Sequence, residues 1–233
     1  RSSKTLLSII QSRLDIISQK ILLPDLTLSP MTSRVPTKIY LLDLAHTHSV
    51  DNSGLLVPLG VAYIKAYTEA MLGNDVEIKI FKHPQLVLNN VLRDKPEIVG
   101  FANYIWHRML NVRIGQYLKS VLPKSLFVAG GPNIDTNNEG RRKFLKTFDF
   151  IDFVISNSGE EPFRQLVEWW RADKGSTRVL PNNLIWMDGE ELKTTPELPA
   201  TKLVDNVPSP YLSGQLDEFL EAGMIPLFES NRG

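Results

Sequence analysis

The sequence predicts an α/β fold: a doubly wound parallel sheet of five strands, of the flavodoxin-like or Rossmann-like kind, with an N-terminal helix before it and a hairpin and linker after it. Two observations predict this class. Short apolar segments rich in β-branched and aromatic residues recur from residue 38 to residue 156, as is typical of strands buried on both faces. Amphipathic segments with helical spacing separate them, and such alternation indicates a parallel sheet with helices on both sides.

The first expected element is an amphipathic helix at residues 5–23. Its apolar side chains recur at helical spacing, at Leu6, Ile10, Leu14, Ile17 and Ile21. The opposite face is not rich in lysine and arginine, which favours docking on the following domain over binding to a membrane or a partner helix. Three prolines within residues 24–36 then predict a linker.

The expected strands follow in order along the chain. They are KIYLLDL (38–44), VEIKIF (76–81), EIVGFANY (97–104), SLFVAGG (125–131) and DFVIS (152–156). Two of the intervening helices show a clear apolar face. The first face consists of Leu110, Ile114, Tyr117 and Val121, and the second of Phe163, Leu166, Val167 and Trp170.

The alternation ends after Trp170. Residues 183–193 predict two short strands around Asp188-Gly189, which is a strong hairpin signal. A proline-rich connector follows, and IPLFES (225–230) is expected to be the first strand of another domain. The predicted domains are an N-terminal helix and linker (1–36), an α/β domain (37–175), a hairpin and proline-rich linker (176–212) and the start of a further domain (213–233).

Composition excludes several function classes. Among the 233 residues, 26 lysines and arginines balance 26 aspartates and glutamates without a long run of one sign, so nothing supports a nucleic-acid partner. The sequence contains no cysteine, which excludes disulfides, thiolate metal sites and cysteine nucleophiles within it. No apolar run reaches the roughly 20 residues that span a bilayer, so we expect no membrane span and a cytoplasmic setting.

Ligands of an open parallel sheet bind beyond the carboxyl ends of its strands, so the residues after each strand are the candidates. The long loop at 45–60 carries His46 and His48. A pair without a third ligand favours solvated or hydrogen-bonded histidines over a metal site, and no metal ligand is assigned. The G-x-G-x-x-G fingerprint is missing after the first strand, which argues against a nicotinamide or flavin dinucleotide.

Two further loops offer ligand contacts beside structural explanations. After the third strand, Asn103 can donate to a ligand, while Tyr104 and Trp106 either form an apolar wall or belong to the core. After the fourth strand, Gly130 and Gly131 permit positive φ and the close approach of a bulky ligand, although a tight turn explains them equally well.

The loop after the fifth strand reads SNSGEEPF (156–163). Ser158 and Glu161 fit a capping box, and acidic residues in a first helical turn suit the helix dipole. This structural interpretation is favoured over general acid or base catalysis by Glu160 or Glu161, and no catalytic residue is assigned. Together with the glycines after the fourth strand, this loop predicts a crevice able to accept a large cofactor tail.

Six stretches resemble, in order, the motifs of radical SAM enzymes with a cobalamin-binding domain. They are VPLGVAYIKAY (57–67), VGFANYIWH (99–107), VAGGPNID (128–135), SGEEPFRQLVE (158–168), VPSPYLSG (207–214) and IPLFESNRG (225–233). In that family a CxxxCxxC motif follows ESNRG and binds the [4Fe-4S] cluster that cleaves S-adenosylmethionine. The resemblance therefore implies that the sequence stops just before this motif, within the start of a radical SAM barrel.

The resemblance also implies a cobalamin at the carboxyl edge of the sheet, with its nucleotide tail along the loops after the third, fourth and fifth strands. Carried over residue by residue, the tail is lined by Ala102, Asn103, Gly130, Gly131, Pro132, Gly159 and Glu160. Two departures stand out. Ala102 replaces a serine of many relatives, and Asp43 and His46 are one residue too far apart for the D-x-H-x-x-G motif, so no axial histidine is expected.

The expected function is thus the cobalamin-binding domain of a radical SAM enzyme that performs methyl transfer or cyclase-like radical chemistry as a full-length protein. Its expected partner is its own C-terminal radical SAM domain, with the [4Fe-4S] cluster and S-adenosylmethionine, while the substrate is left open. Two alternatives remain. One is a cofactor-free domain for substrate recognition or interaction, and the other is a nucleotide-sugar-binding Rossmann-like domain.

Overall fold

We analysed a computed structural model of the chain, which describes residues 35–46, 55–173, 179–199 and 207–229. By its contacts the chain divides into residues 1–34 and residues 35–233. The predicted N-terminal helix lies outside the described residues, and the predicted domain boundaries remain predictions.

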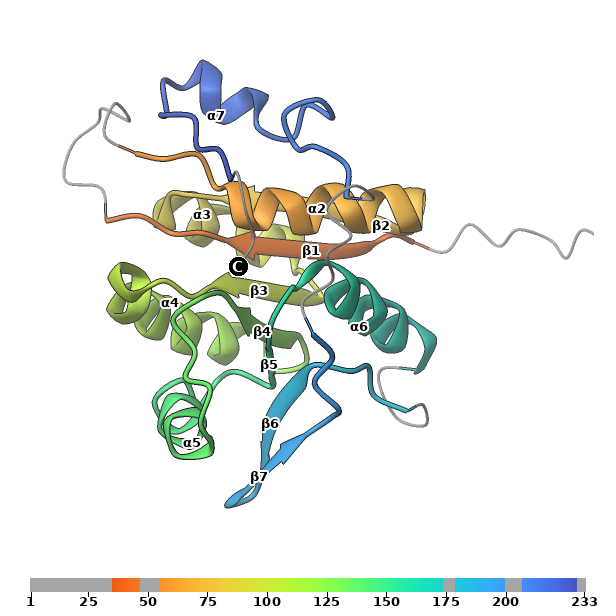
Figure 1. Cartoon of the computed structure of the whole chain (residues 1–233). Helices are drawn as coiled ribbons and strands as arrows, with labels where there is room; N and C mark the ends of the chain where they lie inside the picture. Colours follow the sequence, from red (N-terminus) through yellow and green to blue (C-terminus); the bar gives the residue numbers. More distant parts are fainter. Residues whose placement is uncertain (1–34, 47–54, 174–178, 200–206, 230–233) are drawn as a thin grey trace, which may run out of the picture. The chain divides into compact units, whose positions relative to one another are not determined.

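A sheet with five adjacent parallel strands organises residues 35–233 (Figure 1). The strand order β2-β1-β3-β4-β5 is the flavodoxin-like order. These strands are β1 (Thr37–Leu42), β2 (Val76–Phe81), β3 (Ile98–Ala102), β4 (Leu126–Gly130) and β5 (Phe153–Ile155). The predicted doubly wound parallel sheet is confirmed.

The predicted hairpin consists of β6 (Leu184–Asp188) and β7 (Glu191–Thr194) and turns at Gly189 with a φ of 59°. Strand β6 pairs antiparallel with β5, with Val154 opposite Ile185. The hairpin therefore extends the sheet to seven strands and lies at its lower end in Figure 1. The local turn signal predicted the hairpin but not this pairing, which joins segments distant in the sequence.

Helices cover both faces of the sheet. One face packs against α2 (Leu59–Leu72) and α6 (Glu160–Asp173). The other packs against α3 (Pro84–Asp94), α4 (Arg108–Val121) and α5 (Asn138–Thr147). Two short 3-10 turns, η1 (Gly73–Asp75) and η2 (Ile105–His107), precede β2 and α4. None of the helices in the described parts is long and apolar enough to cross a membrane.

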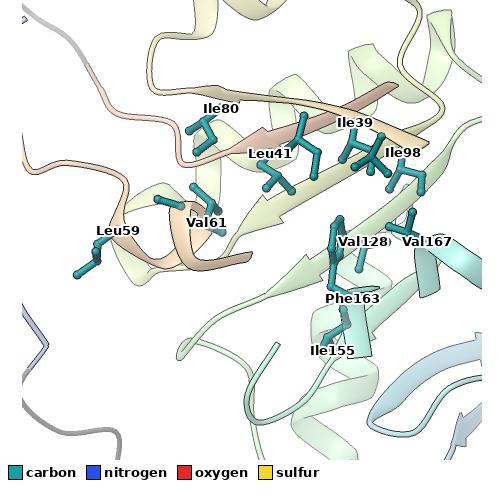
Figure 2. Packing of buried hydrophobic residues seen from close by; sticks show 14 of the residues in the cluster. Ile39, Leu41, Leu59, Val61, Ile80, Ile98, Val128, Ile155, Phe163 and Val167 are labelled. Carbon is teal, nitrogen blue, oxygen red and sulfur yellow. The ribbon is translucent and has the colours of Figure 1, made fainter. Parts of the chain in front are cut away.

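The alternation of β1 shows how the sequence fills both layers. Ile39 and Leu41 point into the cluster beneath α2 and α6, part of which Figure 2 shows, whereas Tyr40 and Leu42 point into the cluster beneath α3, α4 and α5. Successive side chains of a strand face opposite sides, and full burial of such a side chain contributes roughly 1.5–3 kcal/mol. A strand buried on both faces therefore needs an unbroken apolar run.

The predicted apolar face of α6 agrees with the structure, whereas that of α4 agrees only in part. Phe163, Leu166 and Val167 of α6 are buried as predicted. On α4, Ile114 is buried with Leu118, while Tyr117 is 40% exposed, so the predicted position of Tyr117 on the core face was wrong. Residues at i+3 and i+4 from Ile114 are both apolar, and only the tertiary packing decides which one points inward.

The segment at 207–229 returns to the sheet domain after the linker. It contains α7 (Asp217–Glu221) and then an isolated parallel bridge between Ile225 and Leu56. The amide of Ile225 donates to the Leu55 carbonyl at 2.7 Å, and the amide of Val57 donates to the Ile225 carbonyl at 3.0 Å. Within the described residues, the strand expected at 225–230 is limited to this bridge.

Candidate functional site

A cavity of about 530 Å³ lies beyond the carboxyl ends of β3, β4 and β5. Its apolar lining includes Leu41, Val128, Ile155 and Phe163, and its walls come from the start of α2 and the loops after β4 and β5. Pockets of roughly 300–1,000 Å³ commonly hold small-molecule ligands. The cavity lies where ligands of doubly wound sheets bind.

The cavity collects most of the residues predicted to contact a ligand. Six of them line it, namely Ala102, Gly130, Gly131, Pro132, Gly159 and Glu160. The seventh, Asn103, is fully buried beside the cavity and does not line it. The fold thus brings together three loops that are distant in sequence, and the role of these residues in ligand binding stays a prediction.

Gly131 closes the loop after β4 against the end of β3. Its φ is 119°, and a Cβ added there would lie 3.0 Å from both the backbone nitrogen and the backbone oxygen of Asn103. A residue with a side chain would therefore meet both backbone strain and a steric clash. This close approach is a requirement of the fold, so it accounts for the glycine without a ligand.

Gly130 differs from its neighbour because its missing side chain leaves open space. A Cβ at this position would meet only the Ile155 carbonyl oxygen, at 3.9 Å. The position belongs to β4, so its backbone accepts other residues. No packing within the described residues requires a glycine here, and the bare backbone at the cavity is the feature that a bulky ligand would use.

Asn103 uses its amide group to hold a loop. Its Nδ2 donates to the carbonyl of Asn133 at 2.8 Å, and its backbone nitrogen donates to the carbonyl of Gly130 at 2.7 Å. The side-chain amide of Asn103 thus binds the loop after β4, and its predicted donation to a ligand stays a prediction. Its Oδ1 has no hydrogen-bond partner within the part of the chain that is described.

Glu160 begins α6 at the cavity and is buried, with acidic residues filling the first helical turn. The side chain of Glu161 accepts hydrogen bonds from Arg164 and Gln165 and from the hydroxyl of Tyr67 on α2. The bonds from Arg164 lead in lowering the pKa of Glu161 to about 2. Glu161 therefore links α6 to α2, a role that differs from the predicted capping box.

Arg141 of α5 lines the cavity but already has an anionic partner. Its guanidinium makes a bidentate ion pair with Glu197 at 2.6 and 3.0 Å, and its Nε donates to the Asp135 carbonyl at 3.1 Å. The hydrogen bond from Arg141 leads in lowering the pKa of Glu197. The residues after β7 are thereby fastened to the wall of the cavity.

A second fastening joins the same segment to the loop after β5. Asn157 and Asn183 both have positive φ, of 60° and 64°. The amide of Asn157 donates to the Leu198 carbonyl at 3.0 Å, and the amide of Leu198 donates to Oδ1 of Asn183 at 2.7 Å. No sequence motif predicts these contacts, although asparagine is the residue that tolerates left-handed backbone best after glycine.

A buried charged cluster lies at the same edge of the sheet, after β1, β2 and β3. Nζ of Lys82 is 3.2 Å from Oδ2 of Asp43, and Nε2 of His107 is 3.4 Å from Oδ1 of Asp43. Desolvation leads in lowering the pKa of His107, so its ring is neutral near pH 7. No single motif predicts this cluster, because Asp43 and Lys82 directly follow β1 and β2, whereas His107 lies five residues after the end of β3, in η2.

The aromatic residues after β3 occupy two environments. Tyr104 lines the cavity, whereas Trp106 is 62% exposed and stacks on Tyr104 from outside. His46, of the predicted histidine pair, is exposed, and His48 lies outside the described residues. Across the described ranges, no group of three histidine, aspartate or glutamate side chains gathers in a way that could hold a metal ion.

No protein-family model matches the chain, and no curated protein matches it. Solved structures do. The cobalamin-dependent S-adenosylmethionine radical enzyme OxsB with aqua-cobalamin and S-adenosylmethionine bound matches with a TM-score of 0.63 and 15% identity, over 85% of this chain and 27% of that one. Apo OxsB matches with a TM-score of 0.55 and 15% identity, over 78% and 25% of the two chains.

A cobalamin-binding protein from Desulfitobacterium hafniense matches more weakly, with a TM-score of 0.42 and 16% identity, over 58% of this chain and 59% of that one. At such identities a likeness shows the fold alone, and this last score is too low to add to the argument. The chain spans about a quarter of the length of the OxsB structures. Over 85% of its length, the chain therefore shares the α/β fold of one part of OxsB.

Proposed function

We propose that this α/β domain binds a cobalamin at the carboxyl edge of its sheet and serves as the cobalamin-binding domain of a radical SAM enzyme. The observation that carries the proposal is the cavity beyond β3, β4 and β5, where glycines leave the backbone bare. The shared fold with OxsB, whose structure contains aqua-cobalamin, supports the same ligand class.

The residues of the cavity fit part of a cobalamin. A volume of about 530 Å³ suits the nucleotide tail, whereas the whole corrinoid is larger, so the corrin ring would lie outside the mouth. The apolar side chains of Val128, Ile155 and Phe163 suit the flat base of the tail. Gly130 would let the tail approach the backbone, because no side chain occupies the space above it.

The chain's own part in this function is binding and positioning. Bound cobalamin supplies a cobalt centre that carries a methyl group or an electron. The apolar floor would exclude water from the tail, and the loops after β4 and β5, held by Asn103 and Asn183, would fix its direction. The chain lacks the D-x-H-x-x-G motif, so we assign it no axial histidine.

Gel filtration of the purified chain with hydroxocobalamin tests the binding proposal. We expect corrinoid absorbance to elute with the protein, and to be lost in Gly130→Val, whose side chain would fill the cavity. Protein that elutes without corrinoid would overturn the proposal and favour a cofactor-free interaction domain. Thermal stabilisation by a nucleotide sugar, but not by cobalamin, would instead favour the nucleotide-sugar alternative.

We propose further that the partner of this domain is a radical SAM domain of the same polypeptide, with a [4Fe-4S] cluster and S-adenosylmethionine, acting in methyl transfer or cyclase-like chemistry. The resemblance of residues 225–233 to the family motif and the chain's span of about a quarter of OxsB support this. Sequencing of the gene beyond the codon for Gly233 tests it. The absence of three cysteines in CxxxCxxC spacing would overturn this part and leave cobalamin binding untouched.

A further inference from the structure

We propose that Tyr104 and Trp106 form an aromatic platform at the mouth of the cavity, and that this platform stacks against the flat macrocycle of the corrinoid. The inference rests on the proposed function and names a contact that the cavity itself does not supply. It assigns a role to a large exposed indole that neither the core nor the cavity lining explains.

The two rings are held parallel, with centroids 5.0 Å apart and an angle of 8° between their planes. Tyr104 lines the cavity, and its hydroxyl lies so close to the start of α2 that a Cβ at Gly60 would be 3.2 Å from it. Trp106 lies on the outer side of Tyr104 and is 62% exposed. The stack therefore runs from the cavity to its surroundings without a break.

The platform is anchored from beneath by a buried residue. The imidazole of His107 is nearly perpendicular to both rings, at 5.5 Å from Tyr104 and 5.7 Å from Trp106. Only 2% of His107 is exposed, and its Nε2 lies 3.4 Å from the buried carboxylate of Asp43, which pairs with Lys82. A ring pair supported in this way loses little freedom when a ligand stacks on it.

Two exposed apolar side chains adjoin Trp106. Ile105 is 71% exposed and Met109 is 62% exposed, and both adjoin Trp106 along η2 and the first turn of α4. A cluster of exposed apolar side chains indicates a binding surface. This surface is continuous with the cavity through Tyr104, and the cavity is too small for a macrocycle. We therefore infer that the surface binds the ring of the ligand whose tail fills the cavity.

Three probes separate the platform from the cavity: hydroxocobalamin, cobinamide, which keeps the ring but lacks the nucleotide tail, and α-ribazole, which is the tail nucleoside alone. We expect Trp106→Ala to weaken binding of hydroxocobalamin and cobinamide about tenfold, as loss of one stacking contact would. Binding of α-ribazole should stay unchanged, while Gly130→Val should abolish it. Trp106→Phe should restore most of the affinity for cobinamide.

Tyr117→Ala is the matched control, because Tyr117 is an exposed aromatic residue further along α4 and away from the cavity lining. It should bind all three probes as the wild type does. If the wild type binds no corrinoid, the proposed function fails. If it binds hydroxocobalamin and Trp106→Ala binds equally well, the platform is overturned and the proposed function stands. Circular dichroism and the melting temperature show whether each variant is folded.

Discussion

Asn103 and Asn133 hold each other across the carboxyl ends of β3 and β4. Nδ2 of Asn103 donates to the backbone carbonyl of Asn133 at 2.8 Å, and the backbone nitrogen of Asn133 donates to the backbone carbonyl of Asn103 at 3.1 Å. The loop that carries Gly131 and Pro132 is therefore fixed at both ends before any ligand arrives. A loop that is already fixed loses less conformational entropy when a ligand binds, so binding is less costly.

Asn103→Ala should lower both the stability and the ligand affinity of the domain. The variant leaves the Asn133 carbonyl without its donor, and loss of a buried hydrogen bond costs about 1–3 kcal/mol. Urea unfolding and hydroxocobalamin titration measure the two effects. Ser125→Ala is the control, because Oγ of Ser125 donates to the Pro96 carbonyl at 2.7 Å at the opposite edge of the sheet. Equal corrinoid affinity in both variants would contradict a role for the Asn103 bond in binding.

Gly131→Ala should destabilise the domain, because its positive φ and the contact with Asn103 both oppose a side chain. We expect a loss of about 1–3 kcal/mol in the free energy of unfolding, together with weaker corrinoid binding. Gly189→Ala is the control, because Gly189 also has a positive φ, of 59°, but a Cβ there meets nothing within 4 Å. Urea unfolding should show a smaller loss for Gly189→Ala, and its corrinoid affinity should equal that of the wild type.

The sequence allowed the sheet to be predicted because buried parallel strands carry unbroken apolar runs, as KIYLLDL at 38–44 does. The convergence of Gly130 and Gly159 was predictable as well, since parallel strands present their carboxyl ends at one edge. The pairing of β6 with β5 was not, because it joins segments without a local signal. Side-chain directions, such as that of the Asn103 amide toward the Asn133 carbonyl, depend on tertiary contacts.

The cluster of Asp43, Lys82 and His107 shows a further limit. The three residues follow three different strands, and only the strand order β2-β1-β3 brings them together. The sequence contains the polar residues but not their pairing. The ion pairs between side chains that follow the strands can therefore be predicted only once the strand order is known.

We expect the free energy of unfolding to decrease as the pH falls below about 6.5, the ordinary pKa of histidine, because of His107. Its pKa in the folded state is lowered, chiefly by desolvation, so the unfolded chain binds the proton first and stability falls on acidification. Urea unfolding between about pH 7.5 and 5.5 should show this slope, and His107→Gln should reduce it. An unchanged slope in the variant would contradict the assignment to His107.

Lys82→Met should reverse the behaviour of His107. Removal of the lysine leaves the buried carboxylate of Asp43 facing the imidazole alone, 3.4 Å away, so the pKa of His107 rises. If it rises above the unfolded value, stability is retained at low pH and lost as the pH increases through the folded pKa. At neutral pH we expect a loss of about 3–5 kcal/mol, as for other broken buried pairs. NMR titration of the histidine side chains measures the shift directly.

Asp94→Asn should remove a pH-dependent contribution to stability at the far side of the sheet. Asp94 accepts hydrogen bonds from Tyr40 at 2.8 Å, Lys79 at 2.7 Å and Arg93 at 2.8 Å. These bonds hold the pKa of Asp94 far below the ordinary 3.8, with the largest effect from Arg93, followed by Lys79 and Tyr40. A lowered carboxyl pKa stabilises the fold above about pH 3.8, and this stabilisation is lost as the pH falls below it.

The variant should therefore be less stable than the wild type by about 2 kcal/mol at neutral pH, and the difference should shrink on acidification below about pH 4. Glu190→Gln is the control, because Glu190 also pairs with a lysine, Lys146, at 2.8 Å but is 88% exposed. Solvent screens such a pair, so its loss should leave the unfolding curve unchanged. A difference between wild type and Asp94→Asn that stays constant from neutral to acidic pH would show that packing, and not the charge on Asp94, stabilises this corner of the sheet.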